Sequence, residues 1–265
     1  MVSTVRRALA TRRVGHAGTL DPFATGLLVL LIGHATRLLP YLDGEPKVYD
    51  ATIAFGAETD TDDVTGTVVR EAPWPDPSRV RDAVVALTGE IDQVPPSYSA
   101  KHVGGRRAYD VARRGGPVTL APVRVVVHQW RLRQLTPARL DATITCGGGT
   151  YIRALARDMG RLSDSAAHLV ALRRTRSGAF DVADADALDN VRAGRAAVRP
   201  ALAALPHLPA IPLSDADVTR VRQGRTVPAT AGRGTGALVD ERGHLVAVGE
   251  RVGDDWQPRV VLPNA

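Results

Sequence analysis

Residues 15–26 read Gly15-His16-Ala17-Gly18-Thr19-Leu20-Asp21-Pro22-Phe23-Ala24-Thr25-Gly26, and the apolar run Leu27–Ile32 follows directly. The stretch combines three glycines with a single carboxylate, that of Asp21. Glycine lets a backbone turn sharply and lets a ligand approach it closely, so we expect Asp21 to be presented to a ligand. A second interpretation is that Asp21 caps a helix beginning at Pro22, which is a common pairing. The two interpretations are compatible, because a capping carboxylate can still direct one oxygen at a substrate.

Further short motifs follow in a fixed order along the chain. They are Lys47-Val48-Tyr49, Thr59-Asp60-Thr61-Asp62-Asp63, Pro95-Pro96-Ser97-Tyr98-Ser99-Ala100, Gly149-Thr150-Tyr151-Ile152-Arg153 and Leu172-Arg173-Arg174. Together with residues 15–26 they resemble the motifs of the tRNA pseudouridine-55 synthases, over roughly residues 2–180. The family pattern has a Lys-Pro-x-Gly segment ahead of the first helix, and this chain begins within that helix.

The resemblance implies a fold and an activity. The fold is α/β (α+β), with a mixed, largely antiparallel central sheet, flanking helices and a small C-terminal β domain. The activity is the isomerisation of uridine to pseudouridine at position 55 in the T-loop of tRNA, without a cofactor or a metal. The enzyme extrudes the target nucleotide from its stack, which costs a few kcal/mol.

The resemblance also assigns roles to individual residues. Asp21 is the catalytic carboxylate, acting as a nucleophile or as a base at the ribose or at uracil C6, and the sequence leaves these routes open. Tyr49 stacks on the extruded uracil, although its place on the apolar face of a strand is equally typical of a core tyrosine. Arg153 completes the catalytic group.

Other matching positions are assigned to substrate binding. His16 stacks in the RNA where the base was removed, Tyr151 is a second tyrosine of the pocket, Leu172 is its apolar wall and Asp63 supports the site. Each has a plainer interpretation, respectively a solvated loop histidine, a helix-packing tyrosine, a buried helical leucine and a turn-forming aspartate.

Arg153 is informative without the resemblance. It falls in the first turn of a helix predicted over Thr150–Arg161, with Thr150 as its cap. A cation there faces the positive end of the helix dipole, so a nearby anion is expected. Asp21 is the natural candidate, because an ion pair would stabilise its charge. The alternative is an exposed arginine whose long stem reaches solvent.

The charge of the chain favours a polyanionic partner. It has 34 Lys and Arg against 28 Asp and Glu, a net charge of +6 and a pI of about 10.1. Basic residues gather at residues 1–13 and at about 97–124, where Lys101, Arg106 and Arg107 are assigned to phosphate contacts. We therefore expect residues 97–124 to be an RNA-gripping insertion that contacts the T-arm of tRNA. The alternative is a solvated charged face.

Several classes of protein are excluded by composition. A single cysteine, Cys146, allows neither an intrachain disulfide nor a cysteine-based zinc site, and the seven histidines show no ligand spacing. No apolar run approaches the length of a membrane span, and the N-terminus lacks the apolar core of a secretory signal. We expect a cytoplasmic monomer whose partner is tRNA.

The pattern of residues predicts the elements and domains. Val48–Phe55 alternates as a strand with Tyr49 and Ile53 on its apolar face. Strands are also predicted at Val123–Leu135, Leu140–Cys146, Ala237–Val239, Leu245–Val248 and Arg259–Leu262, and helices at Val2–Ala10, Ser78–Leu87 (capped by Ser78) and Ser165–Arg173. The proline-rich stretch Leu205–Pro212 predicts a linker. We expect a catalytic domain over residues 1–204 and a small PUA-like RNA-binding domain over 205–265.

Two rival functions remain open at this stage. The first is a tRNA-binding or RNA-folding protein without catalysis, which the presence of Asp21, Tyr49 and Arg153 disfavours. The second is a pseudouridine synthase for another RNA, which the absence of long basic extensions disfavours.

Overall fold

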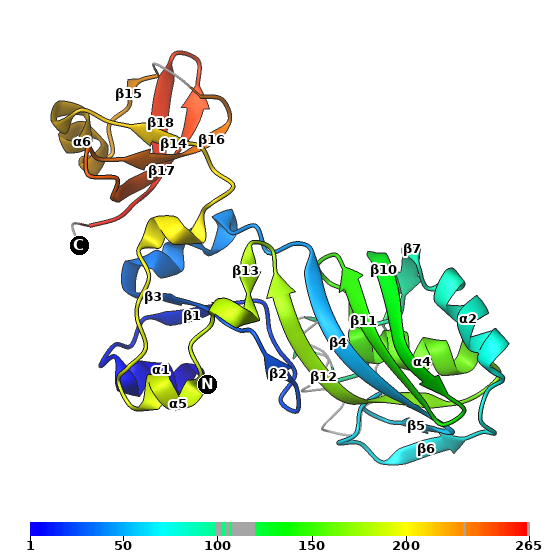
Figure 1. The fold of residues 1–265 in the computed structure, drawn as a ribbon. Coiled ribbons are helices and arrows are strands. Elements are labelled where there is room, and N and C mark those ends of the chain that lie inside the picture. The colour runs from blue at the N-terminus through cyan, green and yellow to red at the C-terminus, as the bar shows by residue number, and fades with distance from the viewer. Residues whose placement is uncertain (99–101, 104–105, 108–119, 230–231, 264–265) are drawn as a thin grey trace. The chain divides into compact units, whose positions relative to one another are not determined.

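The computed structural model describes residues 1–98, 102–103, 106–107, 120–229 and 232–263, with the backbone alone at 102–103 and 106–107. Within these residues the chain forms two compact units (Figure 1). One comprises residues 20–27 and 45–183, and carries the predicted catalytic motifs. The other comprises residues 1–19, 28–44 and 184–265.

A mixed sheet forms the first unit. Its order is β13–β12–β4–β11–β10–β7, and β2 also pairs with β12. The strands are β2 (Thr25–Gly26), β4 (Lys47–Phe55), β7 (Gly89–Gln93), β10 (Val123–Thr136), β11 (Arg139–Cys146), β12 (Ala167–Ser177) and β13 (Phe180–Asp181). Every pairing is antiparallel except that of β2 with β12. The predicted mixed and largely antiparallel sheet is therefore confirmed.

Two helices cover one face of this sheet, α2 (Pro77–Ala86) and α4 (Ile152–Leu162) (Figure 1). The predicted alternation of β4 is confirmed, because Ala51, Ile53 and Phe55 are all buried in the same core cluster as Leu155 and Met159 of α4. Hydrophobic burial on this face fixes the register of β4 between β11 and β12. The register places Tyr49 opposite Ile144 of β11 and Arg174 of β12.

Two strand pairs and a short turn are further described parts of this unit. Strands β5 (Ala57–Thr59) and β6 (Val68–Glu71) form a hairpin, and β8 (His102–Val103) pairs with β9 (Arg106–Arg107). The turn Val182–Asp184, labelled η2, ends the unit.

The helix predicted over Ser165–Arg173 is wrong, since the residues from Ala167 onward belong to strand β12. Two bulges interrupt the pairing of β12 with β4, one between Leu169 and Ala171 and the other between Arg174 and Arg176. A bulge shifts the alternation of a strand by one residue. Leu169 and Leu172 are therefore both buried at a spacing of three, which imitates the period of a helix.

The predicted caps are also corrected. Helix α4 begins after Tyr151 and has no side-chain cap, so Thr150 does not cap it. Helix α2 is capped by Asp76, whose carboxylate accepts a hydrogen bond from the backbone N–H of Ser78. No helix follows Asp21, because the backbone N–H of Ala24 donates to the Asp21 carbonyl at 3.0 Å and closes a turn.

The second unit contains a five-stranded sheet of order β14–β16–β17–β18–β15. The strands are β14 (Ala210–Pro212), β15 (Val227–Pro228), β16 (Thr235–Val239), β17 (Leu245–Val252) and β18 (Asp255–Val261), and helix α6 (Asp215–Arg222) packs on them. The three C-terminal strands predicted from sequence are confirmed. The end of the predicted linker differs, because Ala210–Pro212 pairs in parallel with β16.

Residues from the N-terminal part of the chain share a core with this sheet. Leu38, in the 3₁₀ segment η1 (Gly33–Tyr41), is fully buried with Leu205, Val248 and Val260. The remaining elements of the unit are α1 (Val2–Ala8), β1 (Val14–Ala17), β3 (Val29–Ile32), α5 (Leu188–Arg192) and η3 (Ala201–Ala204). The expected PUA-like character of residues 205–265 stays a prediction.

Candidate active site

Asp21 is anchored through the short strand that follows its turn. Beyond Ala24 the chain enters β2, where the N–H of Leu27 donates to the Arg174 carbonyl at 2.8 Å and Arg174 Nε donates to the Leu27 carbonyl at 2.9 Å. Gly26 has φ +95, and a Cβ there would collide with the Arg174 carbonyl oxygen. Glycine is thus required at residue 26 both for its conformation and for the close approach.

The carboxylate of Asp21 forms a two-pronged ion pair with Arg153. Arg153 Nη2 donates to Asp21 Oδ1 at 2.8 Å, and Arg153 Nε donates to Asp21 Oδ2 at 3.1 Å. The Arg153 side chain is 6% exposed and the Asp21 side chain 26% exposed. The ion pair expected from the sequence is therefore confirmed, and Asp21 remains open to a ligand on one side.

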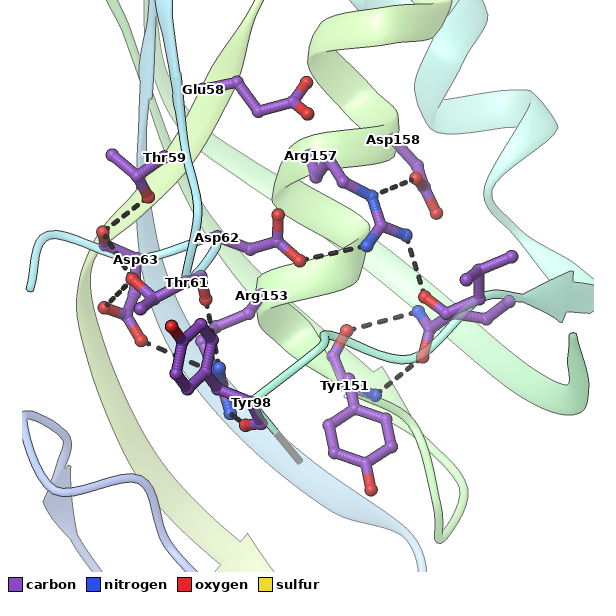
Figure 2. Close-up of polar contacts among 12 residues, drawn as sticks. Glu58, Thr59, Thr61, Asp62, Asp63, Tyr98, Tyr151, Arg153, Arg157 and Asp158 are labelled. Carbon is purple, nitrogen blue, oxygen red and sulfur yellow. Dashed lines mark hydrogen bonds and ion pairs between the residues drawn. The ribbon is translucent and has the colours of Figure 1, made fainter. Parts of the chain in front are cut away.

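Arg153 has further partners on two other segments. Its Nη1 donates to the Thr61 carbonyl at 3.0 Å, its Nη2 donates to the Tyr98 carbonyl at 3.1 Å, and its Nε lies 3.6 Å from Asp63 Oδ2 (Figure 2). Four hydrogen bonds thus fix a guanidinium that carries five N–H donors. The planar geometry of arginine, which lysine lacks, makes such a bidentate contact possible.

The turn after β5 is what positions Asp63. Asp63 Oδ1 accepts hydrogen bonds from Thr61 Oγ1 at 2.8 Å and from the N–H of Thr65 at 2.9 Å, and Thr59 Oγ1 donates to the Asp63 carbonyl at 2.7 Å. Asp63 is 5% exposed. One oxygen of this buried carboxylate is therefore held by its own turn, and the other faces Arg153.

Tyr49 and Leu172 lie on two strands that are paired in the central sheet. Both are mostly buried in the main core cluster, Tyr49 on β4 and Leu172 on β12. Burial raises the pKa of Tyr49, although the neighbouring Arg174 has a lowering effect. The phenol is thus kept neutral, and its burial agrees with the plainer interpretation of a core tyrosine as well as with a ring at the edge of a pocket.

The backbone of Tyr151 is held by the side-chain amide of Gln93. The N–H of Tyr151 donates to Gln93 Oε1 at 2.8 Å, and Gln93 Nε2 donates to the Tyr151 carbonyl at 3.2 Å (Figure 2). Gln93, at the end of β7, is 1% exposed. The Gln93 amide therefore holds Tyr151, which precedes α4 and lies two residues before Arg153.

Sequence reasoning missed two residues of this network, Asp62 and Arg157. Arginines 153, 157 and 161 follow at intervals of four along α4 and so share one face of the helix. Arg157 Nη1 donates to Asp62 Oδ2 at 2.9 Å, and Arg161 Nε donates to Glu58 Oε2 at 3.0 Å. The signal that could have found them is this spacing, read together with the acidic segment 58–63.

The other predicted residues belong to the other compact unit or have side chains outside the described part of the chain. His16 is exposed on β1, in the other compact unit. Lys101 lies outside the described residues, and Arg106 and Arg107 are described only as the backbone of β9. Their assignment to substrate binding stays a prediction.

Two kinds of feature are absent from the described residues. No cluster of three or more histidine, cysteine or acidic side chains suited to a metal ion is found among them, and none of their helices is long and apolar enough to span a membrane.

The arrangement supplies one partly open carboxylate whose charge is balanced by a buried guanidinium. A family model described as the TruB family pseudouridylate synthase N-terminal domain matches residues 6–152, more than half of the chain. The chain belongs to the TruB family. The match covers Asp21, Tyr49 and Asp63, and ends one residue before Arg153.

Curated relatives extend the TruB family match over the whole chain. A protein of Thermobifida fusca (strain YX) named tRNA pseudouridine synthase B is 42% identical over 275 residues, covering 100% of this chain and 94% of its own length. Proteins of the same name from Arthrobacter sp. (strain FB24) and Parasynechococcus marenigrum (strain WH8102) are 44% and 41% identical, covering 89% and 98% of this chain and 79% and 91% of their own lengths.

Solved structures show the same fold. The crystal structure of a Cbf5–Nop10–Gar1 complex matches with a TM-score of 0.68 at 22% identity, covering 98% of this chain and 79% of the matched chain. The structure of an H/ACA RNP bound to a substrate RNA containing 2′-deoxyuridine matches with the same TM-score at 21% identity, covering 99% and 80%. The pseudouridine synthase fold expected from sequence is confirmed.

Proposed function

We propose that this chain converts uridine to pseudouridine at position 55 in the T-loop of tRNA, with Asp21 as the catalytic carboxylate. The observation that carries the proposal is the bidentate Asp21–Arg153 pair, in a member of the TruB family whose curated relatives are named tRNA pseudouridine synthase B. The cytoplasm, where tRNA is found, is the proposed compartment, and the proposed working form is a monomer.

The reaction breaks the bond between uracil N1 and ribose C1′ and joins C5 to C1′. The proton lost from C5 is balanced by a proton gained at N1, so that the reaction needs neither oxidant nor cofactor. Asp21 acts as a nucleophile or as a base, at the ribose or at uracil C6. In either route Arg153 holds the carboxylate as the ionised, correctly oriented form before the base enters. A fixed cation beside a reacting carboxylate acts by electrostatic stabilisation, which is commonly a large term in catalysis.

The remaining predicted residues are given roles on the substrate. Tyr49 stacks on the extruded uracil, Leu172 forms the wall of the pocket and Tyr151 lies at its rim, where the N-terminus of α4 is held by Gln93. Asp63 supports Arg153. The substrate contacts assigned outside this network are those of His16, Lys101, Arg106 and Arg107, with the RNA backbone as the target of the three cations.

The test is to incubate the purified protein with unmodified tRNA and to map pseudouridine at nucleotide resolution. We expect a single modified uridine, at position 55, formed without added metal or cofactor. Modification of another RNA but not of tRNA would replace this proposal with the rival synthase. Binding of tRNA with no modification would favour the RNA-folding protein.

The matched control is Asp21→Asn, which keeps the shape of the side chain and removes its charge. We expect no pseudouridine from this variant and a tRNA affinity within several-fold of the parent. Substantial turnover by Asp21→Asn would remove Asp21 from the chemistry.

A further inference from the structure

Arg157 links two segments of the chain that also meet at Arg153. Its Nη1 donates to Asp62 Oδ2 at 2.9 Å, in the turn after β5, and its Nη2 donates to the Val94 carbonyl at 2.8 Å, just beyond β7. One helical turn earlier, Arg153 binds the same two segments, at the Thr61 and Tyr98 carbonyls (Figure 2). Arg153 and Arg157 of helix α4 therefore each bind both the turn after β5, here called the acidic turn, and residues 94–98.

Asp62 stands between the two contacts that Arg153 makes with the acidic turn. The Thr61 carbonyl accepts from Arg153 Nη1, and the Asp63 carboxylate lies 3.6 Å from Arg153 Nε. Asp62 itself has φ +59, a left-handed conformation that costs free energy for a residue with a Cβ. A displacement of Asp62 would therefore move both partners of Arg153.

Backbone contacts join Asp62 to its own turn and to strand β12. Its N–H donates to the Thr59 carbonyl at 3.1 Å, and its carbonyl accepts from the N–H of Leu169 on β12 at 3.0 Å. The bond from Arg157 is the one that ties the turn to α4 at this residue. Both side chains of the pair are less than 10% exposed, so solvent does not compete for it.

We propose that Arg157 and Asp62 are a positioning pair, which holds the acidic turn in register with α4 so that Arg153 meets Asp21 in the reactive geometry. The proposal rests on the proposed function and deepens it. The pair touches neither Asp21 nor the substrate, and acts through Arg153 alone. It sets the rate of the chemical step and leaves tRNA affinity unchanged.

A dependence on pH follows from the surroundings of Asp62. The charged groups that face it are Arg157, Arg153 and Asp158 of α4 and Glu58 of β5. Burial raises the pKa of Asp62 to about 6, against the lowering effect of Arg157. As the pH falls through that value Asp62 takes up a proton, its attraction for Arg157 is lost, and the rate should fall with it.

The experiment measures single-turnover pseudouridine formation on unmodified tRNA at saturating enzyme across pH 5–8, for the parent, Asp62→Asn, Arg157→Met and Arg157→Lys. We expect Asp62→Asn to lower the rate about tenfold with tRNA affinity within about twofold, since small misplacement of reacting groups is costly. Its rate should be flat between pH 5 and 7, where the parent loses activity. Arg157→Lys should retain more activity than Arg157→Met, because it keeps the charge.

The matched control is Glu58→Gln, another exchange of a buried carboxylate for an amide opposite an arginine of α4. The partner of Glu58, Arg161, lies one helical turn further from Arg153 than Arg157 does. We therefore expect Glu58→Gln to keep the parent rate at neutral pH. Because the Glu58 charge raises the pKa of Asp62, this variant should also move the acid limb to lower pH. An equal loss of rate in Glu58→Gln and Asp62→Asn would show that general destabilisation, not positioning, is at work.

A second readout does not require activity. The Nε–H resonance of Arg153, identified in arginine-labelled protein by its loss in Arg153→Lys, reports its hydrogen bond to Asp21. We expect it to shift in Asp62→Asn and to stay in place in Glu58→Gln. An unmoved resonance, or the parent rate and pH profile in Asp62→Asn, would overturn the positioning pair. A parent that makes no pseudouridine in tRNA would overturn the proposed function alone, because the resonance would still decide the positioning.

Discussion

One guanidinium, that of Arg153, binds both oxygens of Asp21, at 2.8 and 3.1 Å. The contact sets the plane of the carboxylate as well as its charge. Because Arg153 is the second residue of α4 and Asp21 lies in a turn before β2, the pair joins segments 132 residues apart in sequence. The following predictions depend on this geometry and on the units that support it.

Replacing Arg153 should slow the chemistry and spare binding. Arg153→Met keeps much of the apolar stem and removes the cation, and we expect a fall of about two orders of magnitude or more in single-turnover rate. Arg153→Lys should recover only part of it, because lysine lacks the two-pronged geometry. Quench-flow at saturating enzyme, with a filter-binding measurement of tRNA affinity, checks both. A Met variant with the parent rate would show that the pair is structural only.

Gly26→Ala should disturb the anchor of Asp21. The substitution forces a side chain into a left-handed conformation against the Arg174 carbonyl, and we expect it to lower the free energy of unfolding by about 1–3 kcal/mol. The rate should fall as well, since the strand that carries the Asp21 turn must move away from β12. Gly243→Ala is the control, because Gly243 has a similar φ of +80 and no atom within 4 Å of its Cβ position. A similar loss of rate in both variants would contradict the local role of Gly26.

Ionisation of Asp62 should lower the free energy of unfolding as the pH rises. Its folded pKa, about 6, lies above the ordinary 3.8, so the folded state holds this proton more tightly than the unfolded state does. The stabilising contribution is present below about pH 4 and is lost as the pH rises through about 6. Denaturant unfolding at pH 4 and pH 7 should therefore show Asp62→Asn gaining stability relative to the parent at the higher pH. A relative loss at pH 7 would mean that the ionised pair stabilises the fold.

The basic cluster at 97–124 should make tRNA affinity sensitive to salt. For RNA the log–log slope is roughly −0.7 per phosphate neutralised, and the double replacement Arg106→Ala with Arg107→Ala should flatten it. Titrations of tRNA binding at several salt concentrations, from roughly 50 mM to about 300 mM, give the slope and check this prediction. An unchanged slope would place the RNA backbone on other cations.

The C-terminal sheet should unfold together with the segment around Leu38. Leu38, Leu205 and Val248 share one buried cluster, and Leu38→Ala should cost about 2–5 kcal/mol as a large-to-small change in a core. A chain ending before Leu205 loses the same packing, so a stem-loop assay of that truncated protein must be paired with a measurement of its folding. Independent melting of residues 205–265 in the Leu38→Ala variant would contradict a shared core.

The sequence predicted some elements well for a physical reason. Strand β4 alternates without a bulge against β11, so Tyr49, Ala51 and Ile53 show the plain period of two that sequence reading recognises. The Asp21–Arg153 pair was also predictable, because a cation in the first turn of a helix needs a nearby anion. The period of β4 and the need for an anion beside Arg153 are local in the chain, whereas the choice of Asp21, 132 residues away, depended on the motif at residues 15–26.

Other parts could not be predicted because they depend on contacts distant in sequence. The bulges of β12 arise from its pairing with β4, and they gave Leu169 and Leu172 a helix-like spacing. The tie between Arg157 and Asp62 spans 95 residues, and the local signals, the interval of four between the arginines of α4 and the acidic segment 58–63, do not say which residues pair. Helix α2 is capped by Asp76 rather than by Ser78, because the Asp76 carboxylate accepts hydrogen bonds from both the N–H and the hydroxyl of Ser78. Both residue types are good caps, so the sequence alone does not tell which of them caps the helix.

The bonds around Arg153 have a consequence for the timing of catalysis. Its partners at Thr61, Asp63 and Tyr98 come from the folded chain itself, so the entropy of restraining this side chain is lost during folding and not again at each turnover. A dipole or charge that is already oriented needs no reorganisation when charge develops on the substrate. The described residues around Arg153 therefore supply hydrogen bonds and charges that are already oriented before the substrate binds. They take the place of water molecules, which would have to rearrange around the reacting carboxylate.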